Sequence, residues 1–178
     1  MKFFAQILAT AALMALANTG FAQTGSDPYA GKWYRLKTQF RGDGECLEGN
    51  QGSSSVKSGA AFMDKCQNVS GQMWKMEKQS NGYYRLKTKF RGEGECLEGN
   101  GRTSPVKGGA AFMDKCQDVQ GQYWKVTPAG NGFVRLQTMM GSECLEGNQS
   151  ASKVAGGAAF MDKQQNVSGQ LWKLEEVR

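Results

Sequence analysis

The chain has 178 residues, of which 22 are Lys or Arg and 16 are Asp or Glu, so its formal net charge is +6. It contains no histidine, which excludes catalysis by a histidine base and removes the side chain that most often binds metals. The positive charge is compatible with anionic partners but identifies none. The sequence gives no reason to expect a cofactor, a metal site or a nucleic-acid partner.

The first 22 residues have the pattern of a secretory signal peptide. Lys2 provides a positive start, an apolar stretch runs from Phe3 to Ala17, and small residues surround Ala22. The apolar stretch is shorter than the roughly 20 residues that a membrane-spanning helix needs, and no second one follows. We therefore expect residues 1–22 to be removed and residues 23–32 to form a short N-terminal segment. The mature protein is predicted to be secreted, outside the cell or into the periplasm, without a membrane span.

The remainder, residues 33–178, consists of three copies of one unit, offset by 50 and then by 48 residues. The repeated strings are Glu-Cys-Leu-Glu-Gly-Asn, Gly-Ala-Ala-Phe-Met-Asp-Lys and Gly-Gln-x-Trp-Lys. They begin at Glu45, Gly59 and Gly71, again at Glu95, Gly109 and Gly121, and finally at Glu143, Gly157 and Gly169. Such self-similarity indicates a repeat architecture, with repeats at residues 33–82, 83–132 and 133–178.

Each repeat contains four short stretches typical of β-strands, separated by clusters of Gly, Ser and Asn. In the first repeat they are Tyr34–Thr38, Cys46–Glu48, Ala61–Asp64 and Gln72–Met76. Alternation predicts one apolar face, consisting of Leu36, Leu47, Met63 and Trp74. The other face, or the loop edges, then carries Arg35, Lys37, Glu48, Phe62, Asp64 and Lys75. No sustained helical periodicity follows the signal peptide, so the fold class is all-β.

Three such units cannot fold separately, because four apolar side chains do not make a core. They are expected to close around one shared core as a β-trefoil with pseudo-threefold symmetry. A propeller also uses four strands per repeat but typically needs at least four blades. The predicted core is Leu36, Leu47, Met63, Trp74, Leu86, Leu97, Met113, Trp124, Leu136, Leu145, Met161 and Trp172.

The five cysteines follow the repeats. Cys46 and Cys66 lie 20 residues apart, as do Cys96 and Cys116, and each pair is predicted to form a disulfide between the second and third strands. In the third repeat Cys144 is present, but Gln164 occupies its partner's position, so Cys144 is the predicted free thiol. The third repeat also lacks two residues between Thr138 and Glu143, a deletion expected to fall in a turn.

The combination of Cys-Leu-Glu, a Gly-rich loop, a short apolar strand and Gln-x-Trp, found three times, resembles the ricin B-type lectin family. The resemblance covers Trp33 to Lys173, and the three Gln-x-Trp motifs at Gln72, Gln122 and Gln170 make it specific. It implies a β-trefoil in which each repeat can hold a shallow sugar site. Such a site has an acidic residue after the first cysteine, an aromatic platform, and polar groups before the tryptophan.

Not all of these positions match the family equally well. The glutamine matches at Gln72, Gln122 and Gln170, which the resemblance predicts to contact the sugar. The acidic position falls on Glu48, Glu98 and Glu146, where the family usually has Asp; these residues either bind sugar or order the loop through the glutamine. The platform position falls on Asp64, Asp114 and Asp162, which cannot stack on a sugar. These aspartates either bind the ligand through their carboxylates or pair with a neighbouring lysine on the surface. Glycine replaces the Asn that usually precedes the Gln. Phe62, Phe112 and Phe160 are candidate displaced platforms or edge-strand packing. Asn50, Asn100 and Asn148 are either ligand contacts or, more simply, turn residues.

The resulting hypothesis is a monomeric, non-enzymatic, multivalent lectin that binds glycans or polysaccharides, anionic ones included. The alternative is a protein-interaction or inhibitor trefoil that uses one non-repeated loop, such as Gly101–Lys107. A glycosidase with Glu48 and Asp64 as its carboxylates is the weakest alternative, because open trefoil sites rarely hold the paired, buried acids that such chemistry needs.

Overall fold

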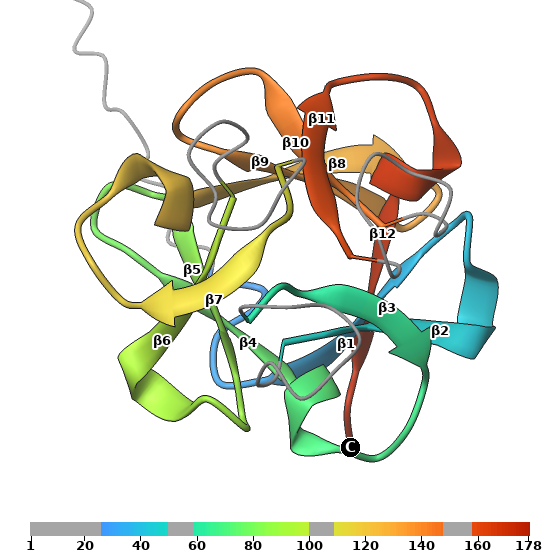
Figure 1. The fold of residues 1–178 in the computed structure, drawn as a ribbon, viewed down its shortest axis with the longest axis horizontal. Coiled ribbons are helices and arrows are strands. Elements are labelled where there is room, and N and C mark those ends of the chain that lie inside the picture. The colour runs from blue at the N-terminus through green and yellow to red at the C-terminus, as the bar shows by residue number, and fades with distance from the viewer. Residues whose placement is uncertain (1–25, 50–58, 100–108, 148–157) are drawn as a thin grey trace, which may run out of the picture.

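The computed structural model describes residues 26–49, 59–99, 109–147 and 158–178. Within these ranges each repeat contributes four strands (Figure 1). The first repeat has β1 (Trp33–Thr38), β2 (Glu45–Glu48), β3 (Phe62–Lys65) and β4 (Trp74–Lys78). The second has β5 (Tyr84–Thr88), β6 (Glu95–Glu98), β7 (Phe112–Lys115) and β8 (Trp124–Gly130). The third has β9 (Phe133–Thr138), β10 (Glu143–Glu146), β11 (Phe160–Lys163) and β12 (Trp172–Glu176).

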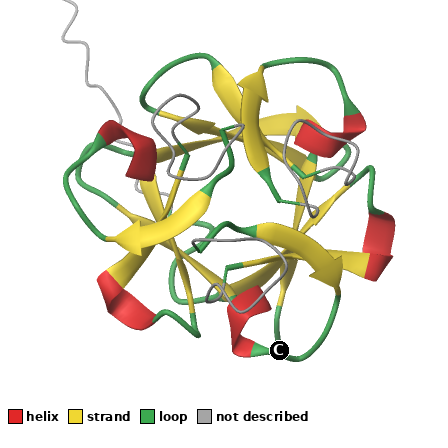
Figure 2. Cartoon of the chain, viewed as in Figure 1, coloured by secondary structure: helices red, strands yellow, loops and turns green. Residues whose placement is uncertain are grey.

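Short 3-10 turns lie at the periphery of the three lobes (Figure 2). Those that precede the fourth strands are η2 (Ser70–Gln72), η4 (Gln120–Gln122) and η6 (Ser168–Gln170). The turns η1 (Gly42–Gly44) and η3 (Gly92–Gly94) precede β2 and β6. Two strand boundaries predicted from the sequence are therefore wrong: Gln72 belongs to η2, so β4 begins at Trp74, and β3 begins one residue after Ala61. The two-residue deletion does fall in a turn, because residues 139–142 form a turn without a 3-10 helix.

The first and fourth strands of the repeats form a closed barrel. Their order is β9-β12-β1-β4-β5-β8, and β8 pairs with β9 to close it. The second and third strands form the hairpins β2–β3, β6–β7 and β10–β11. The hairpins surround the central axis of the three-lobed molecule (Figure 1). This is the β-trefoil expected from three repeats.

The three hairpins are joined to one another at the axis by a ring of backbone hydrogen bonds. Ala61 N donates to Ala111 O, Ala111 N to Ala159 O, and Ala159 N to Ala61 O, each at 2.8 Å. Next to this ring, two phenylalanines pack with alanines in an apolar cluster of their own, which consists of Ala60, Phe62, Ala110, Ala158 and Phe160, and Phe112 lies opposite Ala60. The phenylalanine side chains are only 3–7% exposed. Of the two alternatives for these phenylalanines, this burial favours packing over a displaced platform, because contacts between repeats cover them.

The predicted core is confirmed. All twelve residues belong to one buried cluster, and their exposed fractions range from 0 to 7%. The indole nitrogens of the three tryptophans donate to main-chain oxygens of the hairpins at 2.8 Å, from Trp74 to Leu47, from Trp124 to Leu97 and from Trp172 to Leu145. A Cβ placed on Gly49 would lie 2.7 Å from Cη2 of Trp74 and 2.9 Å from Sδ of Met113. The close contact between hairpin and tryptophan therefore requires glycine after the Cys-Leu-Glu string.

The N-terminal segment closes the barrel at the end opposite the hairpins. Tyr29 makes edge-to-face contacts with Tyr34 and Tyr84, with ring centroids 6.0 and 5.4 Å apart. The Tyr84 hydroxyl donates to Oδ1 of Asp27 at 3.0 Å. Burial first, and then this hydrogen bond, raise the pKa of Tyr84 to about 12. Residues 27–29 are thus part of the folded domain.

Both predicted disulfides are present, Cys46–Cys66 and Cys96–Cys116, and Cys144 is a buried free cysteine. Burial raises the pKa of the Cys144 thiol. The described part of the chain contains no helix long and apolar enough to cross a membrane. The same residues include no cluster of three or more His, Cys, Asp or Glu side chains that could hold a metal ion.

Candidate carbohydrate site

The candidate site lies on the outer face of each hairpin. In the first repeat Cys46 is opposite Asp64 and Glu48 is opposite Phe62, and residues directly opposite in an antiparallel pair share a face. These four side chains therefore lie on the face away from the core, into which Leu47 projects. The register is identical in the other two hairpins. The acidic position and the platform position are thus neighbours on one surface in every repeat.

A buried glutamine holds the glutamate of this face in place. Nε2 of Gln72 donates to Oε2 of Glu48 and to the main-chain oxygen of Lys65, both at 2.9 Å. Its Oε1 accepts from the main-chain nitrogen of Gln67 at 2.7 Å. The same three bonds occur at Gln122 and Gln170, with lengths between 2.7 and 3.0 Å. Both amide protons and the carbonyl are used, so the glutamine orients the glutamate and the loop instead of facing a ligand.

The glutamates lie deeper than the sequence suggests. Alternation assigns Glu48 to the face away from the core or to a loop edge, but Glu48, Glu98 and Glu146 are only 6–8% exposed. These carboxylates are buried because the turn that carries the glutamine folds over them. A carboxylate at this depth is tolerated when hydrogen-bonded. Lys37, also assigned to that face, is 8% exposed, and its Nζ lies 2.6 Å from Oε2 of Glu175.

The aspartates at the platform position remain accessible. Asp64 and Asp114 are exposed and Asp162 is partly exposed. Each Oδ1 accepts a hydrogen bond from the following main-chain nitrogen, at 2.7, 2.7 and 2.9 Å. Oδ2 of Asp162 also accepts from Gln165 at 3.3 Å. These side chains are oriented and within reach of a ligand, but they supply no ring on which a sugar could stack.

The other predicted site residues contribute differently. Phe62, Phe112 and Phe160 are buried, so they cannot stack on a ligand. Asn50, Asn100 and Asn148 lie outside the described residues, as does the loop Gly101–Lys107.

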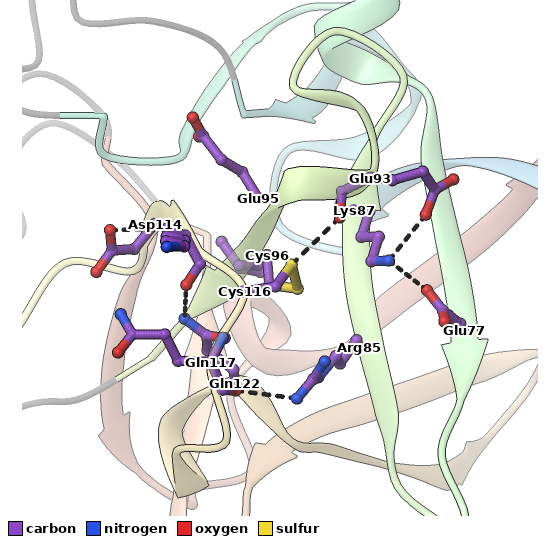
Figure 3. The surroundings of a disulfide bond; sticks show 12 residues. Glu77, Arg85, Lys87, Glu93, Glu95, Cys96, Asp114, Cys116, Gln117 and Gln122 are labelled. Atoms are coloured by element: carbon purple, nitrogen blue, oxygen red, sulfur yellow. Dashed lines mark hydrogen bonds and ion pairs between the residues drawn. A yellow bond between two sulfur atoms is a disulfide. The ribbon is translucent and has the colours of Figure 1, made fainter.

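The surroundings of the second disulfide are strongly charged (Figure 3). Nζ of Lys87 lies between Oε2 of Glu77 at 2.5 Å and Oε2 of Glu93 at 2.8 Å. Burial lowers the pKa of Lys87, but its hydrogen bonds and ion pairs with the two carboxylates outweigh burial and raise it overall. The pKa of Glu93 is lowered by its hydrogen bonds to Lys87 and Lys75. This network joins β5 to its neighbours beside the hairpin and has a structural role.

One set of surface residues was missed by the sequence analysis. Phe40, Phe90 and Met140 occupy equivalent positions just after β1, β5 and β9, and they are 46, 51 and 53% exposed. The signal that could have revealed the first two is the string Phe-Arg-Gly-x-Gly, which two repeats share and which includes none of the core positions.

The profile of the ricin-type β-trefoil lectin domain matches residues 32–172, and the chain belongs to this family. Among solved structures it resembles the designed threefold-symmetric protein ThreeFoil, with 20% identity and a TM-score of 0.66 over 82% of this chain and 99% of that one. It also resembles SeviL bound to asialo-GM1 saccharide, with 18% identity and a TM-score of 0.59 over 83% and 98% of the two chains. For the Rhizoctonia solani agglutinin the values are 14% and 0.63 over 85% and 98%.

In other similar structures the trefoil is one part of a longer chain. The match covers 33% of an endo-β-galactosidase from Clostridium perfringens, with 17% identity and a TM-score of 0.63. A comparison with curated proteins found no match. At these identities the structures establish the shared fold. Family membership supports carbohydrate binding as the general function, and the ricin-type lectin family is generally non-enzymatic.

Proposed function

We propose that the protein is a secreted lectin that binds glycans multivalently, with one site on the outer face of each hairpin. The observation that carries the proposal is the threefold Glu-Gln pair. Each repeat holds a nearly buried carboxylate in a fixed orientation, next to an accessible aspartate on the same hairpin face. A stable trefoil does not need this arrangement, because burying a carboxylate costs free energy even when it is hydrogen-bonded.

A fixed carboxylate suits a sugar, because its oxygens accept short, charge-assisted hydrogen bonds from hydroxyl groups. The three hairpins are distributed around the central axis (Figure 1), so a glycan-covered surface or a branched polysaccharide could engage more than one of them. Weak single sites then gain strength through avidity. Two disulfides are compatible with secretion.

The first test is a glycan array probed with the oxidised mature chain from Gln23, followed by calorimetry with common monosaccharides and acidic polysaccharides. We expect binding to at least one class. Raising the salt concentration separates the ligands, since binding of an anionic polysaccharide weakens with screening and binding of a neutral sugar does not. Absence of binding to every ligand would refute the proposal.

The second test removes the charge of the three glutamates. In the combined variant Glu48→Gln, Glu98→Gln and Glu146→Gln, each new amide still offers a carbonyl oxygen to the neighbouring glutamine, so the fold should persist. Glycan binding should fall with each site changed. Glu176→Gln is the matched control, because Glu176 pairs with Lys32 on the surface, at the end of the barrel away from the hairpins. Unchanged binding by the triple variant would contradict the assigned site.

The alternative of an inhibitor or protein-interaction trefoil depends on the loop Gly101–Lys107, which lies outside the described residues. No described contact favours it over a sugar site.

A further inference from the structure

Three exposed apolar side chains occupy one repeated position. Phe40, Phe90 and Met140 have about half of their surface exposed, more than any other large apolar side chain of the described residues; Val69 and Val119, just before η2 and η4, follow at 37 and 36%. Single exposed apolar residues are normal on protein surfaces. These three side chains, however, are exposed at the same position in every repeat, next to the turn that orders the candidate site. An exposed apolar residue repeated in this way suggests a binding role.

Main-chain hydrogen bonds place each of these residues against the neighbouring repeat. Phe90 N donates to the main-chain oxygen of Ser70 at 3.2 Å, and Phe40 N donates to that of Ser168 at 3.3 Å. Ser70 begins η2 and Ser168 begins η6, the turns whose last residue is the glutamine that holds a glutamate. Phe90 of the second repeat therefore lies beside the site of the first, and Phe40 of the first beside the site of the third.

Distances around Gly121 show how close this position is to the glutamate. A Cβ built on Gly121 would lie 3.1 Å from Cγ of Glu98 and 3.3 Å from Sδ of Met140. The glutamate of the second repeat and the methionine of the third thus flank the same glycine. A larger residue at position 121 would occupy the space between them.

We propose that each sugar site is shared between two repeats. One repeat supplies the oriented glutamate, and the next supplies the apolar wall that the aspartate at the platform position cannot provide. The wall is an aromatic ring in two sites, Glu48 with Phe90 and Glu146 with Phe40. In the remaining site, Glu98 faces Met140. This inference rests on the proposed lectin function and specifies its ligand: a pyranose whose C–H face stacks on the phenylalanine while hydroxyls at its edge reach the carboxylate.

The turn that carries each phenylalanine is held in place, as a stacking platform requires. Arg91 N donates to Oγ1 of Thr88 at 3.1 Å, and the Arg91 guanidinium forms a double hydrogen bond with Glu95. The first repeat has the same contacts at its equivalent positions. The third repeat has lost two residues here, and Gly141 stands in place of the arginine. The site with Met140 therefore has no aromatic ring, and its turn lacks the arginine–glutamate hydrogen bonds of the other two.

A sugar fits these positions better than a protein partner does. The two phenylalanines belong to different lobes, each beside a turn of another repeat, so their exposed rings do not form one contiguous apolar surface. Stable protein interfaces need roughly 1,200–2,000 Å² of contiguous buried surface. One exposed ring matches the size of a single pyranose.

The test uses immobilised galactose, N-acetylgalactosamine, glucose, mannose and N-acetylglucosamine as probes, with the oxidised mature protein in solution. Phe40→Leu and Phe90→Leu keep an apolar side chain but remove the ring, whereas Phe40→Tyr and Phe90→Tyr keep the ring. We expect the double Leu variant to lose about tenfold in affinity, and the double Tyr variant to bind as the wild type does. Both positions changed are exposed, so thermal unfolding should be unaffected.

A gain-of-binding variant provides the complementary test. Met140→Phe should add a ring to the site of Glu98, so calorimetry with the tightest-binding of these sugars should change from two tight sites and one weaker site to three sites of equal affinity. If the wild type binds a glycan and the double Leu variant binds it equally well, the shared site is refuted and the lectin function stands. If the wild type binds no glycan on the array or among these probes, both proposals fail.

Discussion

The vacant cysteine position of the third repeat offers a quantitative test of how the hairpins are built. Cys144 is opposite Asp162 in β10–β11, as Cys46 is opposite Asp64 in β2–β3. Sγ of Cys144 lies 4.0 Å from Oε1 of Gln164. In the variant Gln164→Cys we therefore expect a third disulfide to form without rearrangement of the strands.

The magnitude follows from the length of the closed loop. The two native disulfides span 20 residues, and a loop of that length reduces the entropy of the unfolded chain enough to add about 3 kcal/mol to the free energy of unfolding. For a domain of this size the midpoint of thermal unfolding should rise by roughly 6–12 °C. Guanidinium titration measures the free energy, and a thiol assay on the unfolded, unreduced protein should find no thiol, against one in the wild type.

Two controls make the result decisive. Gln164→Ser removes the amide without adding a thiol and should change the free energy of unfolding by less than about 0.5 kcal/mol. Under reducing conditions the Cys variant and the wild type should become equally stable. A bond that forms but stabilises by less than about 1 kcal/mol would refute the loop argument. Two thiols that stay reduced under oxidising conditions would refute the equivalence of the third hairpin.

Three further perturbations probe contacts that the sequence did not reveal. Gln122→Leu leaves the carboxylate of Glu98 without its amide donor, so the free energy of unfolding in urea should fall by about 2–4 kcal/mol; a loss below 1 kcal/mol would contradict the role of the pair. Tyr29→Ala removes two edge-to-face contacts and should cost about 1–2 kcal/mol, whereas no loss would mean that the N-terminal segment does not close the barrel. Because the pKa of Tyr84 is raised from 10.0 to about 12, its stabilising contribution is complete below pH 10 and is lost as the pH rises toward 12. Ultraviolet titration of tyrosinate, compared with Tyr84→Phe, should show one group that ionises late.

The sequence was sufficient to predict the architecture, because the pattern that defines each strand lies within a few residues and occurs in all three repeats. Alternation within four-residue strands identifies Leu47 and Trp74 as inward-facing, and the repeat places their equivalents in the same environment twice more. The spacing of Cys46 and Cys66 predicted the disulfide, because both ends belong to one hairpin. The same spacing predicted that Cys144 is free, because Gln164 occupies the position of its partner.

The site was decided by the tertiary structure. Alternation says which face of a strand a side chain occupies, but not what covers that face. Phe62 lies on the predicted face yet is buried, because the neighbouring repeats close over it at the axis. Glu48 is buried because a turn carrying Gln72 folds over it. Phe90 approaches the site of the preceding repeat through a hydrogen bond to Ser70, a contact between repeats that no motif within one repeat contains. Burial and proximity between segments depend on how the three units close around the axis, which is why only the folded molecule defines them.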